Sequence, residues 1–98
     1  MYTKEFIKEK LSTDLRWIER GLIVLYNRQT TDEQQSKNTK HLNGRGFNSV
    51  DSSFLTYCSE YILKGNHLSG KYLERVKKRL PRYWNQIREE IQMNENRG

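Results

Sequence analysis

The sequence predicts an all-α domain of three main helices, in which the last two helices form an antiparallel hairpin. Apolar residues recur every three or four positions along most of the chain, which is the period of an amphipathic helix. The 98 residues include a single proline, and no segment shows the apolar–polar alternation of a half-buried strand. Because only 34% of the residues are hydrophobic, we expect one domain with a small core.

A long first helix is predicted over residues 3–29. Ser12 and Thr13 are good N-cap residues and mark the alternative of two consecutive helices, but the uninterrupted apolar period favours one helix. The apolar positions that define this helix are Ile7, Leu11, Leu15, Ile18, Leu22 and Leu25.

The segment of residues 17–26 is apolar on almost every side of this helix. Trp17, Ile23 and Val24 add apolar surface beside the periodic leucines and isoleucines. A helix that is apolar all round belongs at the centre of a fold or of an oligomer. The segment therefore predicts either the middle of the domain or a homodimer contact.

Residues 30–47 are predicted to form a loop, because this stretch has few hydrophobic residues. Thr31 and Gln34 have the spacing of a capping box, at which a helix would resume briefly. Lys40 and Arg45, the latter between two glycines, make the loop basic and able to clamp a phosphate backbone.

A second main helix is predicted over residues 48–64. Asn48 is a candidate N-cap, and Gly65 supplies the left-handed conformation that ends many helices. The apolar side of this helix is formed by Val50, Phe54, Leu55, Cys58, Tyr61 and Ile62.

The last helix is predicted over residues 69–92. Ser69 is its expected N-cap, with Leu68 and Leu73 at the spacing of a hydrophobic staple. Pro81 lies inside the helix, where it removes one backbone hydrogen bond and crowds the preceding turn, so we expect a kink there.

The positive charge of the chain is concentrated in residues 71–82. The whole chain has 18 Lys and Arg against 12 Asp and Glu, a formal net charge of +6, and this segment holds six basic side chains and one acidic. Phosphates along a nucleic-acid backbone match a row of cations, so the sequence predicts binding to nucleic acid or to an acidic or ribonucleoprotein surface. The alternative is an ordinary solvated helix face. We define the cationic stripe as Lys71, Arg75, Lys78, Arg79 and Arg82.

Aromatic residues flank the cationic stripe. Tyr72 and Tyr83 are candidates either for stacking on unpaired bases or for core packing, whereas Trp84 falls on the apolar side of the helix and is expected in the core. Phosphate contacts carry no sequence information, so these residues do not distinguish DNA from RNA or single strands from duplexes.

Neither catalysis nor metal binding is expected from this sequence. Cys58 lies on the apolar side of its helix, where an inert buried thiol is expected, so a nucleophile–base pair with His41 or His67 is disfavoured. We find no metal-ligand spacing, no phosphate-binding glycine loop and no carboxylate pair beside a histidine. We therefore predict a non-enzymatic protein without a cofactor.

The low hydropathy of the sequence predicts that the protein acts outside the membrane. The mean hydropathy is −1.03, and no apolar run approaches the roughly 18–20 residues that cross a bilayer. The first residues are charged rather than typical of a signal peptide. We expect a soluble, unprocessed cytoplasmic protein.

Two parts of the sequence carry a resemblance. One is Trp-Ile-Glu-Arg-Gly-Leu at residues 17–22. The other is Gly-Phe-Asn at residues 46–48, followed by Asp51, Phe54-Leu55, Leu68-Ser69 and Lys71. Together they resemble small uncharacterised helical proteins of bacterial phages and plasmids, and helical hairpins appended to helicase-like or primase-like proteins.

This resemblance implies a mobile-element origin in a bacterial host cell. It also implies a role in DNA processing or, as the alternative, in countering a host defence such as a CRISPR effector by binding its nucleic-acid-binding surface. The sequence departs from the pattern after Ser69, where Gly70 and Lys71 replace a common Lys-Gln pair, and at Pro81 in the basic segment.

Overall fold

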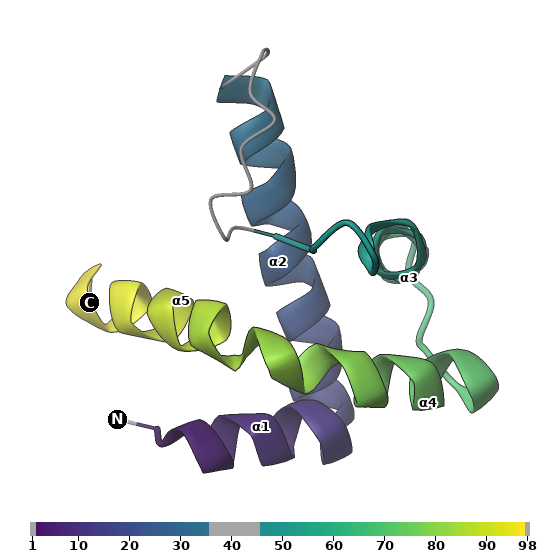
Figure 1. Ribbon diagram of the computed structural model, residues 1–98, viewed down its shortest axis with the longest axis horizontal. Helices are drawn as coiled ribbons and strands as arrows, with labels where there is room; N and C mark the ends of the chain where they lie inside the picture. The colour runs from purple at the N-terminus through teal and green to yellow at the C-terminus, as the bar shows by residue number, and fades with distance from the viewer. Residues whose placement is uncertain (1, 36–45, 98) are drawn as a thin grey trace.

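The computed structural model describes residues 2–35 and 46–97, with side chains for residues 2–29 and 46–94. Within these ranges the chain is helical and contains no strand, which confirms the predicted all-α class (Figure 1). The helices are α1 (Lys4–Thr13), α2 (Leu15–Gln35), α3 (Ser52–Leu63), α4 (Gly70–Arg79), the 3-10 helix η1 (Leu80–Tyr83) and α5 (Trp84–Arg97).

The prediction of one continuous first helix is wrong, because the chain turns at Asp14. This residue has an extended backbone, with φ −104° and ψ 114°, and its Oδ1 accepts hydrogen bonds from the backbone N–H groups of Arg16 and Trp17 at 3.0 and 3.4 Å. Asp14 therefore caps α2. The hydroxyls of Ser12 and Thr13 instead bond back to a carbonyl within α1.

α2 forms the centre of the fold, as predicted for residues 17–26. Ile18, Leu22 and Leu25 are fully buried, and α1, α3 and α5 pack around them within one chain (Figure 1). A homodimer through this segment stays a prediction. The buried core that surrounds α2 includes Ile7, Leu11, Leu55, Val76, Leu80 and Ile87.

The predicted loop of residues 30–47 is shorter than expected at its start, because α2 continues to Gln35. Lys40 and Arg45 lie outside the described residues, so their predicted role stays a prediction. The chain is described again from Gly46, which returns it to the side of α2 and α5.

α3 begins at Ser52 rather than at Asn48. The side-chain Oδ1 of Asn48 accepts a hydrogen bond from the backbone N–H of Asp51 at 2.9 Å, which forms a turn before the helix instead of its first turn. Gly65 follows α3 with a φ of 98°, and this confirms the predicted stop.

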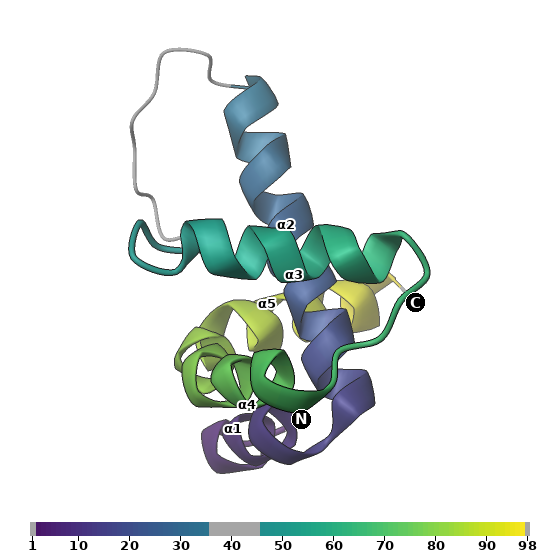
Figure 2. The same cartoon turned by 90° about the vertical axis from the view of Figure 1, so that its right-hand side faces the viewer.

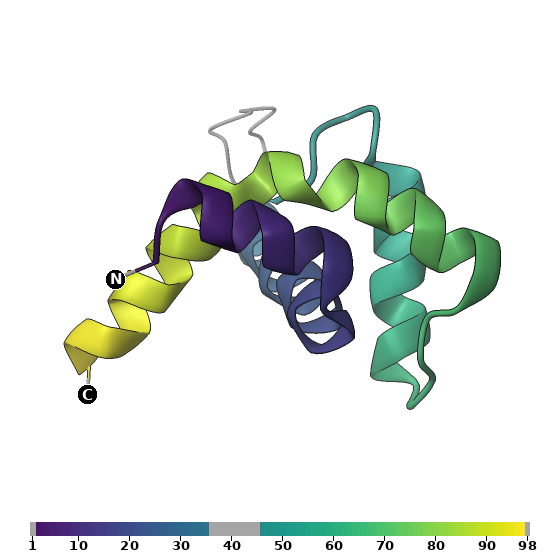
Figure 3. The same cartoon turned by 90° about the horizontal axis from the view of Figure 1, so that it is seen from below.

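The predicted antiparallel hairpin is not formed. Figure 2 shows α3 lying lengthwise while α4 is seen nearly end-on, and Figure 3 shows the same crossing from below. α4 packs mainly against α1 and η1, whereas α3 packs mainly on α2. Because α3 and α4 bury their apolar sides against different helices, they cross instead of packing lengthwise against each other.

The predicted kink near Pro81 is confirmed and takes the form of η1. Pro81 lies in this 3-10 turn, after which the chain continues as α5 to Arg97 in a new direction (Figure 3). Val76, Leu80 and Ile87 remain buried through the change, while Leu73 and Trp84 are partly buried. One apolar side is therefore shared by α4, η1 and α5.

Candidate nucleic-acid interface

The first half of the cationic stripe lies at the surface. Lys71, Arg75 and Lys78 are exposed on α4, and no carboxylate in the described part of the chain forms an ion pair with them. The one acidic residue of the basic segment, Glu74, contacts Lys77 at 3.4 Å. We call Lys71, Arg75 and Lys78 the exposed cations.

Arg75 is held in place by an aromatic ring of α3. Its guanidinium carbon lies 4.2 Å from the ring centre of Phe54, a cation–π contact. The guanidinium N–H groups form no hydrogen bond with the described residues, so they can donate to phosphate oxygens. Arg75 is therefore both an exposed charge and a link between α3 and α4.

The second half of the stripe is engaged in an ion cluster. Nη1 of Arg79 donates to Oδ1 of Asp51 at 2.6 Å, and Nη1 of Arg82 lies 3.5 Å from Oδ2 of the same carboxylate. Asp51 is fully buried, whereas the side chains of Arg79 and Arg82 are 34% and 52% exposed. A buried carboxylate needs such partners, so part of the positive charge is used inside the protein.

Tyr83 belongs to the same ion cluster, so the prediction that it stacks on bases is wrong. The ring is only 6% exposed, and its hydroxyl donates to Oδ2 of Asp51 at 2.7 Å and accepts from the backbone N–H of Asn48 at 3.1 Å. Burial raises the pKa of Tyr83 to about 12; the Asn48 N–H opposes that shift, and the Asp51 carboxylate adds to it. We call Asn48, Asp51, Arg79, Arg82 and Tyr83 the Asp51 cluster.

Tyr72 lies at the surface as predicted, and two tyrosines that the sequence analysis missed lie nearby on α3. Tyr57, Tyr61 and Tyr72 are 53%, 38% and 50% exposed. The ring centres of Tyr57 and Tyr72 are 5.9 Å apart, and those of Tyr57 and Tyr61 are 6.4 Å apart. The spacing of four residues between Tyr57 and Tyr61 indicates that both rings lie on the same side of α3. The sequence analysis instead placed Tyr61 on the apolar side of this helix.

The glycine of the Gly-Phe-Asn motif holds the returning chain against α2 and α5. Gly46 exchanges two backbone hydrogen bonds with the side-chain amide of Gln86, at 2.8 and 3.0 Å. Its φ is 82°, and a Cβ at this position would lie 2.5 Å from Cβ of Gln29, so a glycine is required. Arg28, also buried, donates to the Gln86 carbonyl and pairs with Glu89 at 3.0 Å.

The residues considered for catalysis lie apart. Cys58 is fully buried as predicted, and burial raises the pKa of its thiol to about 11 against a lowering by Arg75. His67 contacts Glu19 at 3.1 Å on the surface, and His41 lies outside the described residues.

In the described part of the chain no group of three or more potential ligands could hold a metal ion, and no helix is long and apolar enough to cross a membrane.

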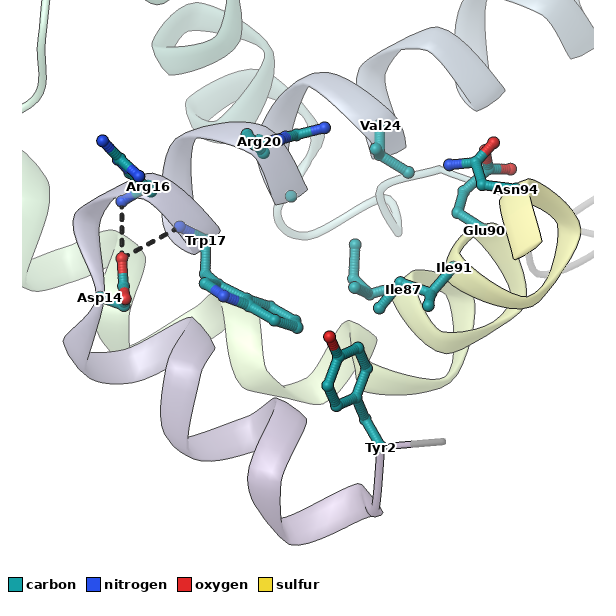
Figure 4. A pocket seen from close by; sticks show the side chains of 11 residues that line it. Tyr2, Asp14, Arg16, Trp17, Arg20, Val24, Ile87, Glu90, Ile91 and Asn94 are labelled. Atoms are coloured by element: carbon teal, nitrogen blue, oxygen red, sulfur yellow. Dashed lines mark hydrogen bonds between the residues drawn. The ribbon is translucent and has the colours of Figure 1, made fainter. Parts of the chain in front are cut away.

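An open cavity of about 570 Å³ lies between the start of α1, α2 and α5. In Figure 4 the rings of Tyr2 and Trp17 face Ile87, and Arg20 and Glu90 lie farther along the edge of the cavity. Figure 1 shows α5 and the N-terminal end of α1 on the left, away from α3 and the start of α4 on the right. No residue predicted for nucleic-acid binding lines the cavity.

No protein-family model, curated protein or solved structure matches this chain. The resemblance to phage and plasmid proteins stays a prediction. Of the predicted site residues, the structure brings the exposed cations and Tyr72 together at the surface, and it assigns Arg79, Arg82 and Tyr83 to the Asp51 cluster.

Proposed function

We propose that this protein is a small non-enzymatic nucleic-acid-binding protein that contacts phosphates through the exposed cations of α4. The observation that carries the proposal is that Lys71, Arg75 and Lys78 lie on one exposed helix face without carboxylate partners among the described side chains. Unpaired cations keep their full positive potential. Phosphates that bind there release condensed counterions, which favours association.

The length of the row also suits a nucleic-acid backbone. Lys71 and Lys78 are two helical turns apart, which is about 10 Å at the rise of an α-helix. Over that distance one strand presents several phosphates. Arg82 extends the row past the kink, where its side chain is half exposed although one nitrogen faces Asp51.

An acidic protein surface, such as that of a host-defence effector, would use the same cations. The exposed rings beside them favour nucleic acid, because bases supply flat partners for aromatic stacking and a carboxylate-rich surface does not. The mobile-element origin implied by the resemblance is compatible with either partner.

Fluorescence anisotropy with labelled single-stranded and duplex oligonucleotides, measured across a salt series, tests the proposal. We expect the logarithm of affinity to fall linearly with the logarithm of salt concentration. Lys71→Glu combined with Lys78→Glu should weaken binding and reduce the salt slope by about 1 to 2. Both side chains are exposed, so the double variant should fold.

The matched control combines Lys8→Glu with Arg16→Glu, two exposed cations of α1 and α2. It changes the net charge by the same amount and should leave most of the affinity intact. Equal weakening by both double variants would show a response to net charge alone and contradict a site on α4. Absence of binding at low salt would contradict the proposed function itself.

A further inference from the structure

Three half-exposed tyrosines form one surface at the crossing of α3 and α4. Tyr57 and Tyr61 are one helical turn apart with nearly parallel rings, at an interplanar angle of 18°. The ring of Tyr72 on α4 contacts that of Tyr57 and extends the row. The ring centres of Phe54 and Tyr72 are 6.1 Å apart. We call Tyr57, Tyr61 and Tyr72 the tyrosine surface.

The packing of the domain does not explain the tyrosine surface. The inner side of α3 already places Leu55 and Cys58 in the core with no exposed area. The three rings lie on the outer side, and their hydroxyls form no hydrogen bond with the described residues. Three adjacent aromatic side chains that keep a third to a half of their area exposed mark a contact surface.

The tyrosine surface adjoins the exposed cations. Lys71 precedes Tyr72 in the chain, and Arg75 lies over Phe54, the ring next to Tyr72. Aromatic rings beside a cationic row are the combination with which proteins hold unpaired nucleotides, because the rings stack on bases while the cations follow the backbone. In a duplex the faces of the bases are covered by neighbouring pairs, so only unpaired bases offer them.

We infer that the tyrosine surface stacks on unpaired bases and that the ligand of this protein is single-stranded nucleic acid. The inference rests on the proposed phosphate contacts of α4 and specifies the strandedness of the ligand. A second copy of the chain fits this surface poorly, because a symmetric contact would bring the Lys71 and Arg75 charges of both copies together. A polyanion with flat apolar bases complements both features.

The test compares Tyr57→Leu with Tyr72→Leu, combined in one variant, against Tyr57→Phe with Tyr72→Phe. Leucine keeps apolar bulk but removes the ring, whereas phenylalanine keeps the ring. We expect the leucine variant to bind a labelled single-stranded oligonucleotide at least about tenfold more weakly, and the phenylalanine variant to bind as the unchanged protein does. Duplex binding and the salt slope should be the same for all three proteins. Tyr2→Leu, which removes a 42% exposed ring just before α1 and outside the tyrosine surface, is a further control.

A second measurement needs no variant and covers the case in which the leucine variant does not fold. The unchanged protein is titrated with a single strand and with an abasic strand of the same length, which has the same phosphates and no bases. We expect the abasic strand to bind at least about tenfold more weakly. Equal affinity for the two strands would overturn the stacking inference while leaving the proposed phosphate contacts standing, whereas absence of binding to every strand would overturn the proposed function.

Discussion

In the first half of the basic segment, Lys71, Arg75 and Lys78 hold their charges at the surface, whereas in the second half Arg79 and Arg82 turn toward the buried carboxylate of Asp51. The two halves look alike in the sequence, and both are rich in Lys and Arg. The difference comes from the side chains that lie beside each half, on α3 and just before it. Beside the first half α3 presents tyrosine and phenylalanine rings, and beside the second half lies Asp51, the buried acid that immediately precedes α3.

The basic segment therefore holds two kinds of positive charge, one that stabilises the fold and one that can meet a partner. A carboxylate with no exposed surface is costly unless cations and hydrogen-bond donors surround it. Arg79, Arg82 and Tyr83 supply those partners, so their contribution is to the joint between α3 and η1. A count of Lys and Arg therefore overstates the positive charge that is available for binding.

The largest effect is expected at Asp51. Asp51→Ala removes the acceptor of Arg79 and of the buried Tyr83 hydroxyl, and we expect the free energy of unfolding to fall by about 3 kcal/mol. The loss stays below that for a fully buried pair because both arginines can turn toward water. Urea denaturation followed by circular dichroism measures it. A loss under about 1 kcal/mol would mean that the cluster behaves as a surface ion pair.

The apolar side of the basic segment was predictable because it depends on local periodicity. Val76 and Leu80 are buried, as the helical period predicts. Pro81 lies in the 3-10 turn because proline lacks a backbone N–H and crowds the preceding turn. Asp14 was harder to recognise, because it directly follows Ser12 and Thr13, which are equally good N-cap residues, and only the extended backbone at Asp14 decides that this residue caps α2.

The split of the cationic stripe was not predictable from the sequence. Asp51 and Arg79 are 28 residues apart, and their contact depends on how α3 crosses α4, which no local pattern specifies. Tyr57 of α3 stays exposed, whereas Tyr83 is buried in contact with Phe47 and Asp51, which precede α3. Sequence periodicity assigns a residue to a side of its own helix, whereas burial depends on which neighbour covers that side.

A smaller effect is expected in alkaline solution through Tyr83. Its pKa is raised to about 12, above the ordinary value of 10, because burial disfavours the phenolate. Its contribution to stability is therefore fully present below pH 10 and is lost as the pH rises through 12. Tyr83→Phe lacks the titrating group, so a component of about 2 kcal/mol in the stability difference between the two proteins should disappear between pH 9 and pH 12. A difference that stays constant with pH, in paired urea titrations, would show that burial does not hold this proton.

The smallest effect is expected at Glu74, the one acid in the exposed half. Its contact with Lys77 joins two residues three positions apart, and the Glu74 side chain is 66% exposed, so Glu74→Ala should change the free energy of unfolding by no more than about 0.5 kcal/mol. The same substitution removes the only negative charge beside Lys71, Arg75 and Lys78 on α4, so oligonucleotide affinity at low salt should rise modestly. Glu74 and Asp51 carry equal charge and both contact the basic segment. Removal of Asp51 should lower stability, whereas removal of Glu74 should mainly raise oligonucleotide affinity. Equal losses of stability in Glu74→Ala and Asp51→Ala would show that the acids of the two halves contribute equally to the fold, which contradicts a division between structural and exposed charge.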